Sequence, residues 1–444
     1  MRSKIGLPCR PRFVRPHKPV RMRLGQERST ALRGLERHAC GAALALLLVF
    51  ACGQSPPAHE SEPAPAPSAS APISPASAAR AAETEAERTK QQSPVPAPPA
   101  HPIDAVPGQK PAAAMTPVPK LLSVQRQRQM MGTIIQMTSV GEPEEKAGPI
   151  LEAALDEMQR LEGLLSEWKP NSDVSKVNDA AGQQPVHVGP ELIDNIRVGL
   201  EVARWSDGAF DLSWAALRGL YLFQPGQERV PTDAELKERL PLVNYRNIVL
   251  DEKQQTVFLK RKGMQLGLGG IAKGYALEKA ANLLKERGIV NYMIFGGGQV
   301  LVNGHKGDRA WRVGVQHPRV NDYFGFIEAD SGSIATSGDY EHAFIKDGKR
   351  WHHIIDLRTG RPVQHTASVT VVSESAFYAD AIDTAIFIMG AKKAMKKLAT
   401  APGPKAEVLM VDSDMRLHMS PGMEKRLIVR TTLVDGKLPL EEPR

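Results

Sequence analysis

Residues 53–120 form a long segment that cannot fold by burying a hydrophobic core. They hold 16 of the chain's 35 prolines, interleaved with alanine and serine in runs such as EPAPAPSAS and SPVPAPPAHP. This composition offers too little apolar area to offset the conformational entropy lost on folding, and proline keeps the backbone extended. We therefore predict a disordered tether over residues 52–120 and a folded domain over residues 121–444.

The region before the tether has the features of an export signal. Residues 39–51 form an uncharged apolar run, which is too short to span a bilayer because a span needs about 20 such residues. An arginine-rich flank, a short apolar core and a small residue before a break are typical of a secretory signal peptide, so we predict a leader over residues 1–51. The sequence VFACG resembles a bacterial lipoprotein cleavage box and makes Cys52 the predicted lipidation site. The alternative is ordinary signal cleavage in which Cys52 has no role.

The formal net charge of +8 belongs to this leader. Residues 1–40 contain 11 of the 57 Lys and Arg residues, which leaves 46 basic and 47 acidic side chains in residues 41–444. A nucleic-acid-binding domain normally carries its own basic surface, so we expect no nucleic-acid partner. All three cysteines lie within the first 52 positions, which excludes a disulfide framework in the folded part. A cysteine-free domain behind a lipid anchor fits the periplasmic face of a bacterial membrane.

Hydrophobic periodicity in the folded part predicts an α+β fold. Hairpins mixed with separated helices favour this class over a doubly wound parallel sheet. We expect one large domain of mixed or antiparallel sheets with flanking helices, in a single body or in two closely packed lobes. The predicted helices cover residues 145–167, 190–205, 271–287 and 379–389. The predicted strands cover residues 134–140, 248–250, 256–260, 292–295, 299–302, 311–316, 369–372 and 408–411.

The segment 266–275, with the sequence LGLGGIAKGY, combines several glycines with a helix start. We predict a short strand, a tight turn and then the helix. The unpaired N–H groups at a helix start favour an anion such as phosphate, glycine lets a ligand approach the backbone, and Lys273 adds positive charge. Gly274 follows the lysine where a Walker loop has serine or threonine, so this is not a Walker loop. The alternative is a structural turn with a solvent-exposed lysine.

The segment 379–385, with the sequence ADAIDTA, places three oxygen-bearing side chains on one face of a helix. Positions i, i+3 and i+4 bring Asp380, Asp383 and Thr384 together. Carboxylate and hydroxyl oxygens suit Mg²⁺, which binds phosphates through few protein ligands. The apolar residues that follow indicate a buried helix, and buried acids need a partner. The alternative is helix capping by Asp380 and a solvated Asp383.

Two further segments carry candidate polar residues. His352 and His353 are adjacent in a predicted strand, so they face opposite sides and do not easily bind one metal ion. A single imidazole is a candidate general base because its pKa lies near the operating pH. The alternative is a histidine satisfied by backbone groups in an edge strand. The segment 335–340, with the sequence ATSGDY, is predicted as a polar turn between strands with no chemistry of its own.

Taken in order along the chain, these segments resemble the ApbE family of FAD:protein FMN transferases. The resemblance covers residues 130–425, essentially the whole folded part. It rests on seven motifs, which are MGT (131–133), SEWKPNS (166–172), GAFD (208–211), GLGGIAKGYA (267–276), TSGDYE (336–341), HIIDLRTGRP (353–362) and ADAIDTA (379–385).

The resemblance implies an enzyme that binds FAD with Mg²⁺ and moves FMN onto a Thr or Ser hydroxyl of a target protein, with release of AMP. The expected acceptor is an exported electron-transfer flavoprotein. His353 is the implied base that deprotonates the acceptor hydroxyl. The implied metal ligands are Asp380, Asp383, Thr384 and the backbone carbonyl of Gly270. The implied FAD-binding positions are Met131, Trp168, Ala209, Phe210, Asp211, Gly267, Lys273 and Ile354.

Three positions differ from the family pattern. Gly267 stands where the family usually has an aspartate that contacts FAD, Gln299 replaces an aspartate, and Leu357 replaces a proline. We expect altered FAD recognition from these differences. Two alternatives therefore remain beside the transferase, namely an Mg²⁺-dependent FAD pyrophosphatase that yields FMN and AMP, and a non-catalytic flavin-binding lipoprotein.

Overall fold

The computed structural model describes residues 121–440. The predicted leader, Cys52 and the proline-rich segment lie outside the described residues. The described residues all fall within one compact unit. No helix in this described part is long and apolar enough to cross a membrane.

An eight-stranded sheet, antiparallel throughout, organises the fold. Its first two strands form a hairpin that is extended by strands from the second half of the chain. In spatial order the strands are β1 (Ser123–Met130), β2 (Thr133–Val140), β6 (Tyr292–Gly296), β7 (Gln299–Asn303), β11 (Ser331–Gly338), β16 (Thr366–Ser373), β17 (Ala406–Asp412) and β18 (Leu417–Met419).

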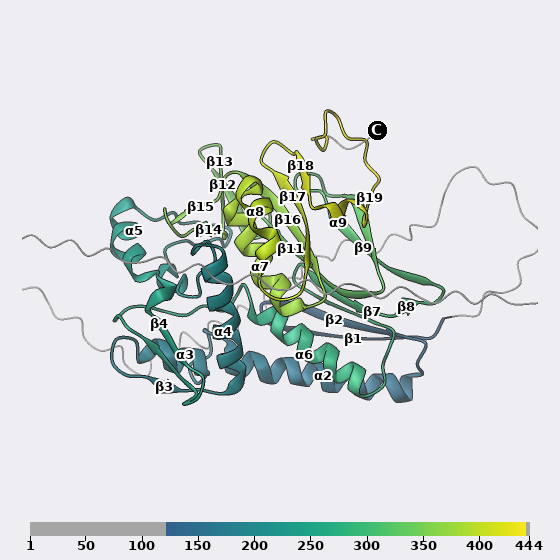
Figure 1. Cartoon of the computed structure of the whole chain (residues 1–444), viewed down its shortest axis with the longest axis horizontal. Coiled ribbons are helices and arrows are strands. Elements are labelled where there is room, and N and C mark those ends of the chain that lie inside the picture. The colour runs from purple at the N-terminus through teal and green to yellow at the C-terminus, as the bar shows by residue number, and fades with distance from the viewer. Residues whose placement is uncertain (1–120, 441–444) are drawn as a thin grey trace, which may run out of the picture. The chain divides into compact units, whose positions relative to one another are not determined.

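One face of this sheet is covered by three helices, α2 (Glu144–Leu165), α6 (Ala272–Glu286) and α7 (Ala376–Met389). Apolar residues spaced three and four apart give α2 and α6 a buried stripe, whereas α7 is buried on almost every side. The stripes pack onto alternate residues of the strands, such as Ile135 and Met137 of β2, and form the main core. Figure 1 shows α6 and α2 running side by side beneath α7.

The other face of the sheet is covered by a second, four-stranded sheet. Its order is β19 (Leu427–Val429), β10 (Tyr323–Ala329), β9 (Arg309–Gln316) and β8 (His305–Lys306). The two sheets enclose a second apolar core that includes Trp311, Phe324 and Ile327. The central strand β16 is consequently buried along its whole length on both faces.

The remaining elements include a three-stranded sheet, two hairpins and several short helices. Figure 1 shows α3, α5, β3 and β4 at one end of the described part and β8, β9 and β19 at the other. The strands are β3 (Val186–His187), β5 (Thr256–Leu259), β4 (Ile248–Asp251), β12 (Ala343–Lys346), β13 (Lys349–His352), β14 (Ile355–Asp356) and β15 (Arg361–Pro362). The α-helices are α3 (Asp173–Asp179), α4 (Pro190–Trp205), α5 (Asp233–Arg239), α8 (Ala391–Lys397) and α9 (Pro421–Glu424). The 3₁₀ turns are η1 (Ala215–Leu217), η2 (Leu240–Leu242), η3 (Tyr245–Asn247) and η4 (Leu398–Thr400).

The α+β prediction is confirmed, but two local predictions are wrong. Residues 335–338 are not a polar turn, because they form the end of β11 and pair with β16. Pairing with strands that are distant in sequence overrides the local turn propensity. The strand predicted before the glycine-rich turn is absent from these described residues. Gln265 makes only an isolated β-bridge to Trp214. The backbone at Leu266 is instead bound by the side chain of Asn178.

The contact between α6 and α7 depends on Gly274. A Cβ atom at this position would lie 2.2 Å from the carbonyl oxygen of Ala376 and 2.7 Å from Cβ of Asp380. Such overpacking against backbone usually costs about 1–3 kcal/mol. We therefore expect Gly274→Ala to lower the free energy of unfolding in urea by about 2–3 kcal/mol.

Gly163 in α2 supplies the matched control, because a Cβ atom there meets nothing within 4 Å. Since alanine is the better helix former, Gly163→Ala is expected to raise the free energy of unfolding by about 0.5–1 kcal/mol. If both substitutions change the free energy of unfolding equally, helix propensity determines the effect at Gly274 and the close contact between α6 and α7 does not.

Candidate functional site

The acids of α7 meet the beginning of α6 in the interior of the molecule. Asp380 and Asp383 are both nearly inaccessible to solvent. The ammonium group of Lys273 lies 2.8 Å from Oδ1 of Asp380, and the Gly274 N–H donates to Oδ2 over 2.8 Å. The structure therefore brings together two segments that are about 110 positions apart in sequence. Lys273 is not the solvent-exposed lysine of the alternative interpretation.

Asp383 lacks such a cation. Its Oδ1 accepts a hydrogen bond from the Thr384 hydroxyl over 3.1 Å, and the Ser337 hydroxyl also faces it. Burial, and next the charge of Asp380, raise the pKa of Asp383, while Lys273 acts in the opposite direction. Burial also opposes the charge on Lys273, but the neighbouring carboxylates outweigh it and raise the pKa of this lysine. The site thus holds one more buried carboxylate than its lysine neutralises.

The helix-capping alternative for Asp380 is wrong. Ser375 is the N-cap of α7, and its Oγ accepts a hydrogen bond from the Tyr378 N–H. Asp380 instead occupies the second turn, where it has no capping role.

Gly270 lies directly against this acidic site. A Cβ atom at this position would lie 3.5 Å from Oγ1 of Thr384 and 3.3 Å from a ring carbon of Phe210. The absence of a side chain leaves the backbone open towards Thr384. Lys273, Gly270 and the face of α7 predicted from the sequence therefore form one site, with the ring of Phe210 buried beside it.

His352 and His353 face different environments, as their adjacency predicts. His352 ends β13 and is buried, with its ring edge against Phe387 of α7. Its Nδ1 accepts from the Ile354 N–H over 3.3 Å, so Nε2 carries the proton and donates to the Val363 carbonyl over 2.6 Å. Both ring nitrogens are therefore used to fix the backbone around His353.

The ring of His353 is open to solvent on one side and surrounded by protein on the others. Its edge meets the ring of His342 at a centroid distance of 5.4 Å. Burial, followed by the charges of His342 and His352, lowers the pKa of His353, and Lys273 is near enough to contribute. The imidazole is neutral and accessible at pH 7, which is the form that accepts a proton.

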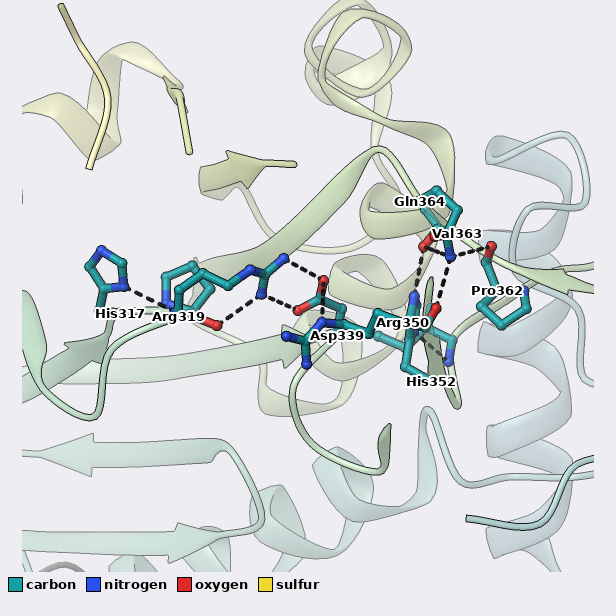
Figure 2. A network of polar contacts seen from close by, with 10 residues as sticks. His317, Arg319, Asp339, Arg350, His352, Pro362, Val363 and Gln364 are labelled. Atoms are coloured by element: carbon teal, nitrogen blue, oxygen red, sulfur yellow. Dashed lines mark hydrogen bonds and ion pairs between the residues drawn. The ribbon is translucent and has the colours of Figure 1, made fainter. Parts of the chain in front are cut away.

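Asp339 anchors the turn that leads to His342. Figure 2 shows its carboxylate between Arg319 and Arg350. Arg319 donates through two nitrogens, over 2.7 and 2.8 Å, and Asp339 is buried. Such a fork holds the carboxylate in one orientation. Arg319 and Asp339 are 20 positions apart, so no local sequence pattern links them and the ion pair is not predictable from the segment 335–340 alone.

Trp168 lies on the molecular surface with 73% of its area exposed. The Arg218 guanidinium lies over one face of its ring, 4.5 Å from the centroid. The neighbouring Glu167 accepts from the Leu268 N–H over 3.5 Å, which links this loop to the glycine-rich turn. Met131 belongs to the same region, since its N–H donates over 2.7 Å to Glu162, which also pairs with Lys169.

The other implied FAD-binding positions are more enclosed. Both carboxylate oxygens of Asp211 accept hydrogen bonds, from Ser213 and from the Tyr245 N–H. Burial raises the pKa of Asp211 despite these bonds. Ile354 is buried beside His352, and Ala209 is half-buried between α4 and Phe210.

Each of the three departures from the family pattern fits its surroundings in the structure. A side chain at Gly267 would meet the Trp214 ring at 2.7 Å, because the indole fills that space. Gln299 is fully buried, and its Nε2 donates to the Ser333 hydroxyl and to the Ala376 carbonyl at the start of α7. Leu357 packs with the small cluster around Leu217 and Leu236.

Known proteins match this chain over most of its described part. The model of the ApbE family matches residues 131–410. An FAD:protein FMN transferase of Klebsiella pneumoniae (strain 342) is 32% identical over 273 residues, which is 60% of this chain and 85% of that protein. The crystal structure of the ApbE protein from Thermotoga maritima superposes with a TM-score of 0.63 at 32% identity, covering 69% of this chain and 99% of that one. The flavin transferase ApbE from Vibrio cholerae superposes with a TM-score of 0.60 at 25% identity, covering 69% and 100% of the two chains.

Proposed function

The chain belongs to the ApbE family, and we propose that it transfers FMN from FAD to a protein acceptor. The observation that carries the proposal is the buried acid pair that meets Lys273 at the start of α6, with the accessible imidazole of His353 near enough for the charge of Lys273 to act on it. Carboxylates that hold a cation form a site for binding a pyrophosphate. An accessible base can accept the proton of a hydroxyl nucleophile. The names of relatives that are 32% identical agree with this chemistry.

In the proposed reaction His353 accepts the proton of a Thr or Ser hydroxyl on the acceptor. The hydroxyl oxygen forms a bond to the phosphorus of the FMN half of FAD. The anhydride bond to the other phosphate breaks at the same phosphorus, and AMP leaves with the electron pair. His352 keeps the base in place through its hydrogen bonds to the flanking backbone.

The residues around Asp383 fit an Mg²⁺ ion. Burial, and next the charge of Asp380, raise the pKa of this carboxyl, and a bound cation would offset both effects. Carboxylate, hydroxyl and carbonyl oxygens are the hard ligands that Mg²⁺ prefers. Asp383, Thr384 and the Gly270 carbonyl would hold the ion, with Asp380 completing the set, although Lys273 and Gly274 hold both oxygens of Asp380 in this structure. The ion neutralises pyrophosphate charge when it is bound.

The FAD pyrophosphatase remains the second candidate, because His353 is open to solvent and water can take the place of the acceptor hydroxyl. Chromatography of the products separates the two activities. The transferase needs acceptor protein to release AMP and leaves no free FMN. The pyrophosphatase releases FMN and AMP without acceptor. A flavin-binding protein without catalysis would retain intact FAD under every metal tested.

We further propose that the enzyme is exported and held by a lipid on Cys52 at the periplasmic face of a bacterial membrane. Export fits an exported electron-transfer flavoprotein as the acceptor. What supports this is the sequence pattern of residues 39–53.

Replacing Cys52 by serine tests the anchor. We expect the Cys52→Ser protein to lose incorporation of a labelled fatty acid and to move from the membrane to the soluble fraction. Cys40→Ser is the matched control and is expected to keep both properties, because that residue lies within the predicted leader. A wild-type protein that is soluble and unlabelled would contradict the proposal.

A further inference from the structure

Arg218 is a half-buried cation that the proposed reaction does not use. It follows η1, and its guanidinium lies between the ring of Trp168 and the carboxylate of Glu167. About a fifth of the Arg218 side chain is exposed, and the carboxylate of Glu167 lies 3.4 Å away. Burial lowers the pKa of Arg218, and Glu167 opposes that shift only in part.

The hydrogen bonds of Arg218 do not explain its position. In the part of the chain that the structure describes, the buried Nε has no hydrogen-bond partner, and the buried Nη2 has no hydrogen bond but forms an ion pair with Oε1 of Glu167 over 3.4 Å. Nη1 makes one long hydrogen bond, 3.4 Å, to the Glu167 carbonyl. Leaving buried donors unsatisfied costs free energy, whereas a guanidinium on an indole face gains cation–π energy. The ion pair with Glu167 and the stacking contact with Trp168 are therefore the interactions that hold the Arg218 guanidinium.

The stacking leaves the opposite face of Trp168 open, which accounts for its 73% exposure. A planar guanidinium restrains an indole more firmly than a flexible ammonium group does. The same loop is linked to the glycine-rich turn through Glu167 and the Leu268 N–H. The loop that carries the open indole face is thus connected to the glycine-rich turn that precedes Lys273.

We propose that Arg218 is a positioning residue that holds Trp168 as a rigid stacking surface for a planar ring of FAD. The identity of the ligand rests on the proposed function, but the restraint of Trp168 does not. A surface that is ordered before binding saves the conformational entropy of ordering it with the ligand. The open face of an indole is a good partner for a heteroaromatic ring.

The test separates the restraint from the binding. In flavin-free protein, the contribution of Trp168 to fluorescence anisotropy is obtained by subtracting the signal of a Trp168→Phe counterpart. In the same proteins the Kd for FAD is measured from flavin fluorescence. We expect Arg218→Met to lower the anisotropy of Trp168 and to weaken FAD binding about tenfold. Arg218→Lys keeps the charge and is expected to fall between wild type and Arg218→Met.

Arg312→Met is the control, since Arg312 lies over the Phe326 ring at 5.0 Å in the second sheet, and it is expected to change neither readout. In a Trp168→Ala background, Arg218→Met is expected to have no further effect on the Kd. If Arg218→Met does not fold, Arg218→Lys carries the test.

The possible results distinguish the restraint of Trp168 by Arg218 from the proposed function. Unchanged anisotropy, or lower anisotropy with an unchanged Kd, overturns the inference while the proposed function stands. Weaker binding that persists in the Trp168→Ala background also overturns it, because Arg218 would then contact the ligand directly. If Arg218→Met lowers the anisotropy of Trp168 but the wild-type protein binds no FAD, the restraint of Trp168 is supported and the proposed function is contradicted.

Discussion

Asp383→Asn is expected to lower Mg²⁺-dependent flavin transfer on the order of 10³-fold, because a metal ion contributes several kcal/mol of charge stabilisation at a pyrophosphate. Asparagine keeps the size of the side chain and removes its charge. The rate of acceptor labelling at saturating FAD, measured over a range of Mg²⁺ concentrations, gives the effect. Activity that stays within about threefold of wild type would mean that the acid pair only supports the fold.

The stability of the metal-free protein provides an independent check on Asp383. Its folded-state pKa is raised, so the folded protein prefers the protonated carboxyl. The resulting stability is complete below the ordinary aspartate pKa and is lost as the pH rises through the raised value. The free energy of unfolding of metal-free wild type is therefore expected to fall from acidic towards neutral pH. Asp383→Asn is expected to lack this decrease, and Mg²⁺ should restore the stability of wild type alone.

His353→Gln is expected to lower the transfer rate by about 10²–10⁴-fold, the usual contribution of a general base. The Kd for FAD should change little, because the imidazole faces the incoming hydroxyl. In wild type the pKa of His353 lies below the ordinary histidine value, so the base is neutral at pH 7. The transfer rate should therefore be flat through neutrality and should fall only as the pH drops through this lowered pKa.

His342→Gln is the control for this second prediction. His342 touches the ring of His353 and is one cause of its lowered pKa. Its removal should leave the rate at pH 7–8 nearly unchanged and should move the acidic limb of the profile to higher pH. If His353→Gln keeps the wild-type rate and pH profile, then His353 is not the base.

The sequence predicted the helices well, because a period of 3.6 residues reports which face of a helix is buried. The grouping of Asp380, Asp383 and Thr384 follows from the same period and is present in α7. Periodicity does not indicate which distant residues a helix face contacts. The pairing of Lys273 with Asp380 and the stacking of Arg218 on Trp168 join residues about 107 and 50 positions apart, so no local pattern could predict them.

The wrong prediction of a turn at residues 335–338 also results from contacts with residues that are distant in the sequence. Serine, threonine and glycine favour turns when they are considered locally. Here β7 and β16 pair with both edges of β11 and supply the backbone hydrogen bonds that a turn would supply. Small side chains on this strand also leave room for α7, which packs against it. Asp339 is a buried anchor because Arg319, in the loop between β9 and β10, and Arg350 both pair with it.

In the proposed reaction a hydroxyl of another protein, and not water, accepts the FMN group. The most direct measurement is the intact mass of a purified exported flavoprotein acceptor after incubation with this enzyme, FAD and Mg²⁺. We expect a gain equal to one FMN group on a Thr or Ser residue, with one AMP released per labelled acceptor and no gain with Asp383→Asn. Free FMN and AMP with no mass gain on several acceptors would contradict the claim.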